Sequence, residues 1–159
     1  MAAKKYPLDP LAKLREQHVD AAMRELAEAV REREAAERKA RAAEEEQERA
    51  AARALEMREA ERAKLERGEL KVADLMRADA WGVAVAEEKR RLEAHVERAT
   101  VAESEARAGE AEQRTVVAAR KADAEVIEKD RAKWTEQARK DALLREEEEA
   151  GEAWRPKRG

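Results

Sequence analysis

The chain of 159 residues contains no cysteine, which excludes a disulfide framework, a cysteine-ligated zinc site and a thiol nucleophile. Aromatic residues are almost as scarce, with three Trp, one Tyr and no Phe. No apolar run approaches the roughly 18 residues that a membrane-spanning helix needs. The N-terminal segment 1–5 precedes no hydrophobic stretch of the kind found in signal peptides. These absences predict a cytoplasmic protein without membrane insertion.

Large aliphatic residues are also few, at 11 Leu, 10 Val and one Ile, so we expect no compact core. Charged residues make up 46% of the chain, yet the net charge is only -3 because both signs are interleaved. A net charge near zero argues against the disorder that accompanies low hydrophobicity and high net charge. Interleaving also leaves no basic face, so nucleic-acid binding is not expected.

Proline is absent for 145 residues between Pro10 and Pro156, and this interval holds four glycines. Proline disrupts a helix interior by about 3 kcal/mol. Alanine, with 38 residues, and the abundant Glu, Arg and Lys are good helix formers. This composition is typical of long helices and coiled coils.

The helix boundaries follow from local signals. Asp9 is expected as the N-cap, with Pro10 at the first helical position. Gly68 follows basic residues and is expected to end the first helix in a left-handed conformation. We predict an all-α fold, an antiparallel two-helix coiled-coil hairpin with helices over about 8–67 and 72–150 and a turn over 68–71. Residues 1–159 form a single elongated hairpin with flexible ends at 1–7 and 151–159; the alternative is one continuous helix with a weak point at Gly68.

The apolar positions recur at helical spacing, and pairing residues whose numbers add to about 139 brings large residues together. Leu11 then meets Ile127, and Leu55 meets Val85. From Val96 the spacing is a heptad pattern, which requires a partner helix. This agreement favours a monomeric antiparallel hairpin. The first stripe runs through Leu11, Leu14, Val19, Ala22, Met23 and Leu26, the second begins with Val72, Leu75, Met76, Val83 and Ala86, and Glu103, Glu110, Arg120 and Arg131 interrupt the heptads.

No arrangement of catalytic residues is recognisable. His18 and His95 are the only histidines, and the pairing keeps them apart. Glycine-rich phosphate loops are absent, and we expect no pocket in a two-helix coil. The sequence therefore predicts a non-enzymatic protein without a metal or cofactor.

The four aromatic residues stand out against this background. Trp134 occupies a heptad position near the start of the first helix and is expected to plug that end against Tyr6 and Leu8. Trp81 follows the turn, where hairpin packing and partner contact are both open, because tryptophan is a frequent interface anchor. Trp154 lies beyond the coil. From Ala132 onward the second helix is expected to extend past the first.

Several segments resemble FliJ-type proteins, which are called YscO or SctO in injectisomes. The resemblance covers nearly the whole length. It is carried by the segment from Leu8 to Ala22, by Gly68-Glu69-Leu70 with Ala73-Asp74-Leu75, by Trp81, and by Glu148–Ala153.

The resemblance implies an antiparallel coiled coil that forms the central stalk of a type III export ATPase. Members insert the end that bears both termini into the hexameric ATPase and promote its assembly and activity. Their turn end contacts the cytoplasmic ring of the export gate, at the base of the export apparatus, and some members bind export chaperones. Carried over by position, the ATPase-binding end comprises Leu8, Leu11, Leu14, Trp134, Leu143 and Leu144, and the export-gate end comprises Leu75, Met76 and Trp81.

The alternative is a self-associating structural coiled coil, such as a scaffold protein. In that case the turn at Gly68 would be absent and helices would pair between chains. Whether the export system is flagellar or an injectisome stays open.

Overall fold

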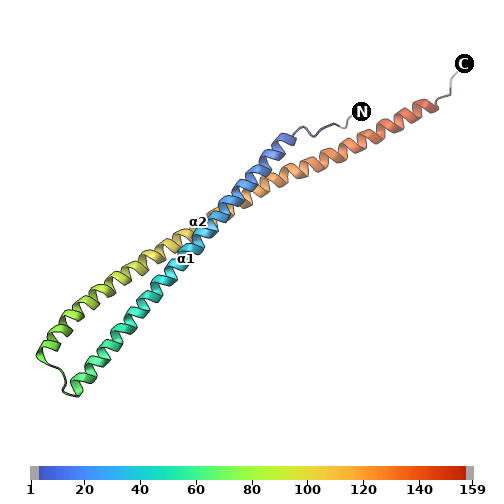
Figure 1. Cartoon of the computed structure of the whole chain (residues 1–159). Coiled ribbons are helices and arrows are strands. Elements are labelled where there is room, and N and C mark those ends of the chain that lie inside the picture. Colours follow the sequence, from blue (N-terminus) through green and yellow to red (C-terminus); the bar gives the residue numbers. More distant parts are fainter. Residues whose placement is uncertain (1–3, 157–159) are drawn as a thin grey trace. The chain divides into compact units, whose positions relative to one another are not determined.

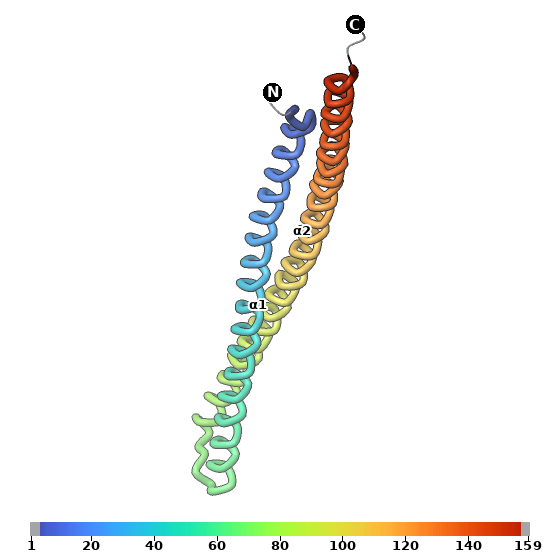
Figure 2. The backbone as a smooth tube through the Cα atoms, turned by 90° about the vertical axis from the view of Figure 1, so that its right-hand side faces the viewer, coloured from blue at the N-terminus to red at the C-terminus, as the bar shows by residue number. Residues whose placement is uncertain are grey.

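The structure, a computed structural model, describes residues 4–156, and these form two long helices and no strand. Helix α1 spans Asp9–Glu66 and helix α2 spans Val72–Trp154, and they pack together as a helical hairpin. The predicted all-α hairpin is therefore confirmed. The chain divides into a terminal unit, residues 1–26 and 113–159, and a turn unit, residues 27–112. Within each unit α1 and α2 run side by side in opposite directions (Figures 1 and 2).

The start of α1 differs in detail from the expected cap. The backbone carbonyl of Leu8 accepts from the Ala12 N–H at 2.9 Å, so Leu8 holds the N-cap position and Asp9 is the first helical residue. The Asp9 carboxylate instead forms ion pairs, with Arg131 at 2.6 Å and with Lys13 at 3.4 Å. Pro10 still lies in the first turn, where its missing N–H leaves no helical bond unmade.

The turn forms as the sequence predicts. The Glu69 N–H donates to the Lys64 carbonyl at 3.0 Å and the Gly68 N–H donates to Leu65 at 3.1 Å. This bond pair requires a left-handed residue at the position after the helix, and Gly68 has a φ of 68°. The carbonyls that a helix end leaves without partners are thereby satisfied, and the chain reverses direction over residues 67–71.

Helix α2 starts with a side-chain cap and runs further than expected. The Lys71 N–H donates to the Asp74 carboxylate at 3.0 Å, as in one half of a capping box. The helix includes Gly151 and ends at Trp154, beyond the predicted end near Ala150. Of the ends expected to be flexible, residues 1–3 and 157–159 lie outside the described residues.

We use the word seam for the partly or fully buried positions where the two helices face each other within a unit. Alanine dominates the seam of α1, and its most buried residue, Ala43, is 1% exposed. Small side chains bury little area but let helix backbones approach closely, so larger residues of α2 can face them. The buried residues of α1 are Ala12, Ala22, Ala40 and Ala43, and those of α2 are Leu92, Glu110, Val117 and Ile127.

The structure brings together two of the residue pairs that the sequence predicts. Leu11 packs against the cluster that contains Ile127, and Leu55 and Val85 line the same hollow. Some apolar positions of the expected stripe are wrong: Leu14 and Met23 are exposed, whereas Ala22 is buried. The seam follows backbone position, and alanine fills it where a larger neighbour points to solvent.

The beginning of α2 departs most from the prediction. Val72, Leu75, Met76, Val83 and Ala86 were expected to form its stripe, but all five are exposed. The seam instead passes through Asp74, Ala78, Trp81, Val85, Glu88 and Leu92 before it reaches Val96. Two successive steps of four residues, 88 to 92 and 92 to 96, interrupt the alternation of three and four and locally unwind a supercoil.

A charged network crosses the seam of the turn unit. Arg33 Nε donates to Glu110 Oε2 at 2.5 Å, and Arg33 Nη1 donates to Glu37 at 2.9 Å. Glu37 also pairs with Arg41 at 2.6 Å. The hydrogen bond to Glu110 raises the pKa of Arg33 above its ordinary value. A register shift would separate Arg33 from the buried Glu110, so this pair favours the observed alignment.

Candidate partner-binding sites

A cluster around Tyr6 closes the terminal unit where α1 begins. We call it the Tyr6 cluster, and it consists of Tyr6, Ala12 and Ile127 with Leu11 and Trp134 packed against them. Tyr6 is only 8% exposed although the sequence places residues 1–7 outside the ordered hairpin. Its ring meets Trp134 edge to face, with centroids 5.6 Å apart at 63°. The predicted contact between Trp134 and Tyr6 is therefore present, whereas Leu8 is exposed.

Charged groups of α2 fix Tyr6 in this position. The Tyr6 hydroxyl donates a hydrogen bond to the Asp130 carboxylate. The guanidinium of Arg131 lies 5.4 Å from the centre of the Tyr6 ring and pairs with Asp9 at 2.6 Å. The hydrogen bond to Asp130, followed by burial, raises the pKa of Tyr6 to about 12. Sequence reasoning gave no role to Asp130, whose signal is its place one turn before Trp134.

The structure separates the six residues expected at the ATPase-binding end into two groups. Leu11 and Trp134 lie in the Tyr6 cluster, partly buried. The remaining four are exposed: Leu8, Leu14, Leu143 and Leu144. Leu14 also lines a hollow of about 210 Å³ together with His18, Arg120 and Asp123. Arg15 lines the same hollow and donates to the Asp123 carbonyl at 2.6 Å.

Within the terminal unit α2 continues past the start of α1, as expected (Figure 2). Asp9, the first residue of α1, pairs with Arg131, and α2 then runs on to Trp154. This extension carries Leu143 and Leu144, both exposed, and ends in Trp154, which is 85% exposed. A long helix with exposed large apolar residues is a surface that a partner protein can cover.

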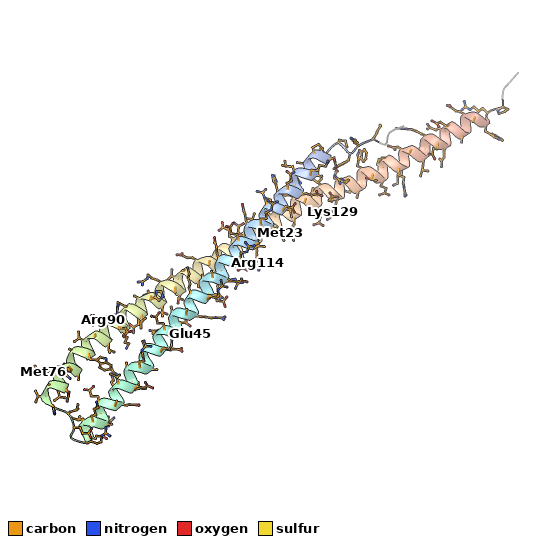
Figure 3. The ribbon with its side chains drawn as sticks, in the orientation of Figure 1. Met23, Glu45, Met76, Arg90, Arg114 and Lys129 are labelled. Atoms are coloured by element: carbon orange, nitrogen blue, oxygen red, sulfur yellow. The ribbon has the colours of Figure 1, made fainter. Side chains whose placement is uncertain are left out.

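The turn unit distributes its expected contact residues over two faces. Trp81 is partly buried and lines a hollow of about 570 Å³ with Met57, Leu70 and Arg77. Hairpin packing, one of the two roles left open for Trp81, is thus present. Leu75 and Met76 are exposed, and Met76 is labelled near the start of α2 in Figure 3.

Sequence reasoning missed the extent of the exposed face on α2. Val72 is 74% exposed, Met76 71% and Val83 62%, and their spacing of four and seven residues places them on one side of the helix. Residues 80–86 form an uncharged run of seven in a chain that is 46% charged. The available signal was this local loss of charge.

We expected no pocket, but the turn unit has a second hollow besides the one that Trp81 lines. It measures about 500 Å³ and is lined mainly by small and aliphatic side chains, including Ala51, Ala54, Leu55, Val85 and Leu92. Across residues 4–156 no group of His, Asp and Glu side chains is arranged to hold a metal ion. Neither helix, over the same residues, contains an apolar stretch that could cross a bilayer.

Comparisons with protein-family models, with curated proteins and with solved structures found no match for this chain.

Proposed function

We propose that this protein is the non-enzymatic central stalk of a bacterial type III protein export ATPase. In this proposal the terminal unit enters the pore of the hexameric ATPase and promotes its assembly and activity. The turn unit contacts the cytoplasmic ring of the export gate, and export chaperones are further partners. The protein then acts in the cytoplasm at the base of the export apparatus.

The observation that carries the proposal is the way in which the seam is built. Alanine fills α1's buried positions, and several charged residues of the seam have partners within the hairpin, as Arg33 has in Glu110. Two helices held in this manner need no second chain to bury their facing sides. A stalk inside a ring requires a charged outer surface and few anchoring residues, and two long helices in a chain that is 46% charged suit this requirement.

The terminal unit supplies suitable anchors for a ring. Trp134 and Leu11 form an apolar cluster, and Leu143 and Leu144 are exposed on the extension of α2. Tryptophan side chains dominate the binding energy of many interfaces. Acidic and basic residues surround these anchors and limit non-specific attachment.

A pull-down with the hexameric export ATPase tests the proposal. We expect the wild-type chain to bind and Trp134→Ala to bind about tenfold less tightly or worse, because truncation of an interface tryptophan commonly removes more than 1 kcal/mol. Trp81→Ala is the matched control, since it removes the same side chain from the turn unit. Equal binding by both variants, with helicity unchanged in circular dichroism, would contradict the proposal.

The alternative of a self-associating scaffold retains one supporting observation. Its original form required an uninterrupted helix, but the chain reverses at Gly68. Hairpins could still associate through the exposed face of Val72, Met76 and Val83. Sedimentation equilibrium distinguishes the two functions. A stalk is expected to be a monomer of 18.0 kDa, whereas a scaffold is expected to form a larger species that Met76→Glu dissociates.

A further inference from the structure

The side chain of Trp134 is already in contact with a segment of its own chain. Tyr6 precedes α1, and its ring packs against the Trp134 ring in a T-shaped arrangement, with the two ring centroids 5.6 Å apart. Tyr6 is the more buried of the two residues. The proposed function assigns Trp134 to partner binding, so the surface needed for that contact is partly occupied in the free chain.

Three further interactions hold the occupying segment. The Tyr6 hydroxyl donates to Asp130, the Arg131 guanidinium lies 5.4 Å from the ring centre, and Arg131 pairs with Asp9. All these groups of α2 lie within one turn of Trp134. The hydrogen bond from the Asp9 N–H to the Tyr6 carbonyl, at 3.2 Å, links the segment to the start of α1.

The short segment is nonetheless attached by few groups. Residues 4, 5, 7 and 8 are exposed, so Tyr6 is its sole buried side chain among the described positions. Release of Tyr6 would uncover Trp134 and Ile127 while the seam contacts of α1 from Ala12 onward persist. A displacement of this kind needs no unfolding of the hairpin.

We propose that Tyr6 acts as an internal ligand that covers the Trp134 surface and that a partner must displace. The proposal rests on the stalk function and goes beyond it, because it defines the chemistry of the incoming group. That group is an aromatic side chain that can donate a hydrogen bond to the Asp130 carboxylate, carried by a segment with a carboxylate for Arg131. Such a group replaces the interactions that Tyr6 and Asp9 make with Asp130, Arg131 and Trp134 of α2.

The first test uses the chain alone, with Trp81→Phe and Trp154→Phe so that Trp134 is the one fluorescent tryptophan. Acrylamide quenching of Trp134 is measured for the chain with Tyr6 unchanged and for its Tyr6→Phe and Tyr6→Ala variants. Lys5→Ala is the control, because it changes an exposed neighbouring position. We expect greater quenching for Tyr6→Ala than for Lys5→Ala, with Tyr6→Phe between them. Equal quenching in all four chains would show that Tyr6 does not cover Trp134 and would overturn the proposal.

The second test measures binding of the same chains to the hexameric export ATPase. Because removal of a competing internal ligand raises apparent affinity, Tyr6→Ala is expected to bind about two- to tenfold more tightly, the range that one aromatic pair accounts for. Unchanged or weaker binding by Tyr6→Ala, when wild type binds, overturns the competition and leaves the stalk function standing. Absence of binding by wild type and every variant overturns the stalk function, and with it the displacement, whereas the quenching result still decides whether Tyr6 covers Trp134.

Discussion

Charged side chains occupy several seam positions that coiled coils usually fill with apolar residues. Arg33 with Glu110 and Arg131 with Asp9 each join α1 to α2. Pairs of this kind add little net stability, because the desolvation of two charges offsets their attraction. They do penalise other alignments, which would leave a charge unpaired against the partner helix. An alanine seam has few distinctive shapes, so we infer that these pairs select the register.

Tyr6 provides a test at the level of one titrating group. Its pKa is raised to about 12 in the folded chain, from an ordinary value of 10.0 that the unfolded chain retains. A group whose folded pKa is raised stabilises the fold fully below the unfolded pKa, and this contribution is lost as pH rises from 10 through about 12. We therefore expect the stability difference between wild type and Tyr6→Phe to be constant up to about pH 10 and to decrease between pH 10 and about pH 12.

The titration itself is measured by the ultraviolet absorbance of the tyrosinate, which is unambiguous because Tyr6 is the one tyrosine. The native chain should titrate near pH 12, and the chain in denaturant should titrate near pH 10. A native midpoint near 10 would show that the hydrogen bond to Asp130 does not hold in solution.

At the scale of the helices, close packing of alanine predicts sensitivity to added volume. Ala43→Leu inserts three carbon atoms at a position that is 1% exposed, and overpacking of this kind costs about 1–3 kcal/mol. Ala42→Leu makes the same change at an exposed neighbour and should alter stability by less than about 0.5 kcal/mol. Thermal or urea unfolding of both variants measures the contrast. Equal stability of the two would mean that the helices are not in close contact at Ala43.

The turn gives a second contrast between matched substitutions. Gly68→Ala places a side chain in the left-handed conformation, at a cost of about 1–2 kcal/mol. Gly109→Ala makes the same change inside α2, where an added Cβ meets no atom within 4 Å and helix propensity improves by roughly 0.5–1 kcal/mol. Opposite signs in urea unfolding are expected. Stabilisation by Gly68→Ala would contradict the left-handed turn.

The sequence predicted the hairpin and its turn because both depend on strong local signals. A proline-free run specifies helix, and Gly68 with its basic flank specifies a C-terminus. The heptads from Val96 onward were also sufficient to identify the partner-facing side. These features depend on backbone conformation and on the spacing of apolar residues, and both can be recognised in the sequence.

The first turns of α2 could not be predicted in the same way. Val72, Leu75, Met76 and Val83 are apolar residues at helical spacing, and such a stripe is normally assigned to the hairpin interior. The structure instead buries the side that carries Ala78, Trp81 and Val85 and includes Asp74 and Glu88. The side of α2 that faces away from α1 is apolar as well. Periodicity alone therefore cannot decide which of the two sides packs against α1. Likewise, the hydrogen bond from Tyr6 to Asp130 joins residues 124 positions apart, and no local pattern indicates it.

At the scale of the whole chain, the hairpin gathers into the terminal unit the features that we assign to ATPase binding. The Tyr6 cluster and the exposed residues Leu143 and Leu144 belong to this unit, whereas Leu75, Met76 and Trp81, the residues assigned to the export gate, belong to the turn unit. In the proposed function, the two partners therefore correspond to two separate sets of residues. Substitutions in one unit should affect one partner and spare the other.

The measurement that tests the stalk function most directly is stimulation of the export ATPase by a chain truncated after Ala138. This truncation removes Leu143, Leu144 and Trp154 but leaves the Tyr6 cluster and the seam in place. We expect weaker binding and a loss of ATPase stimulation, while circular dichroism shows that the remaining residues stay helical. Binding and stimulation equal to those of the full chain would contradict the account.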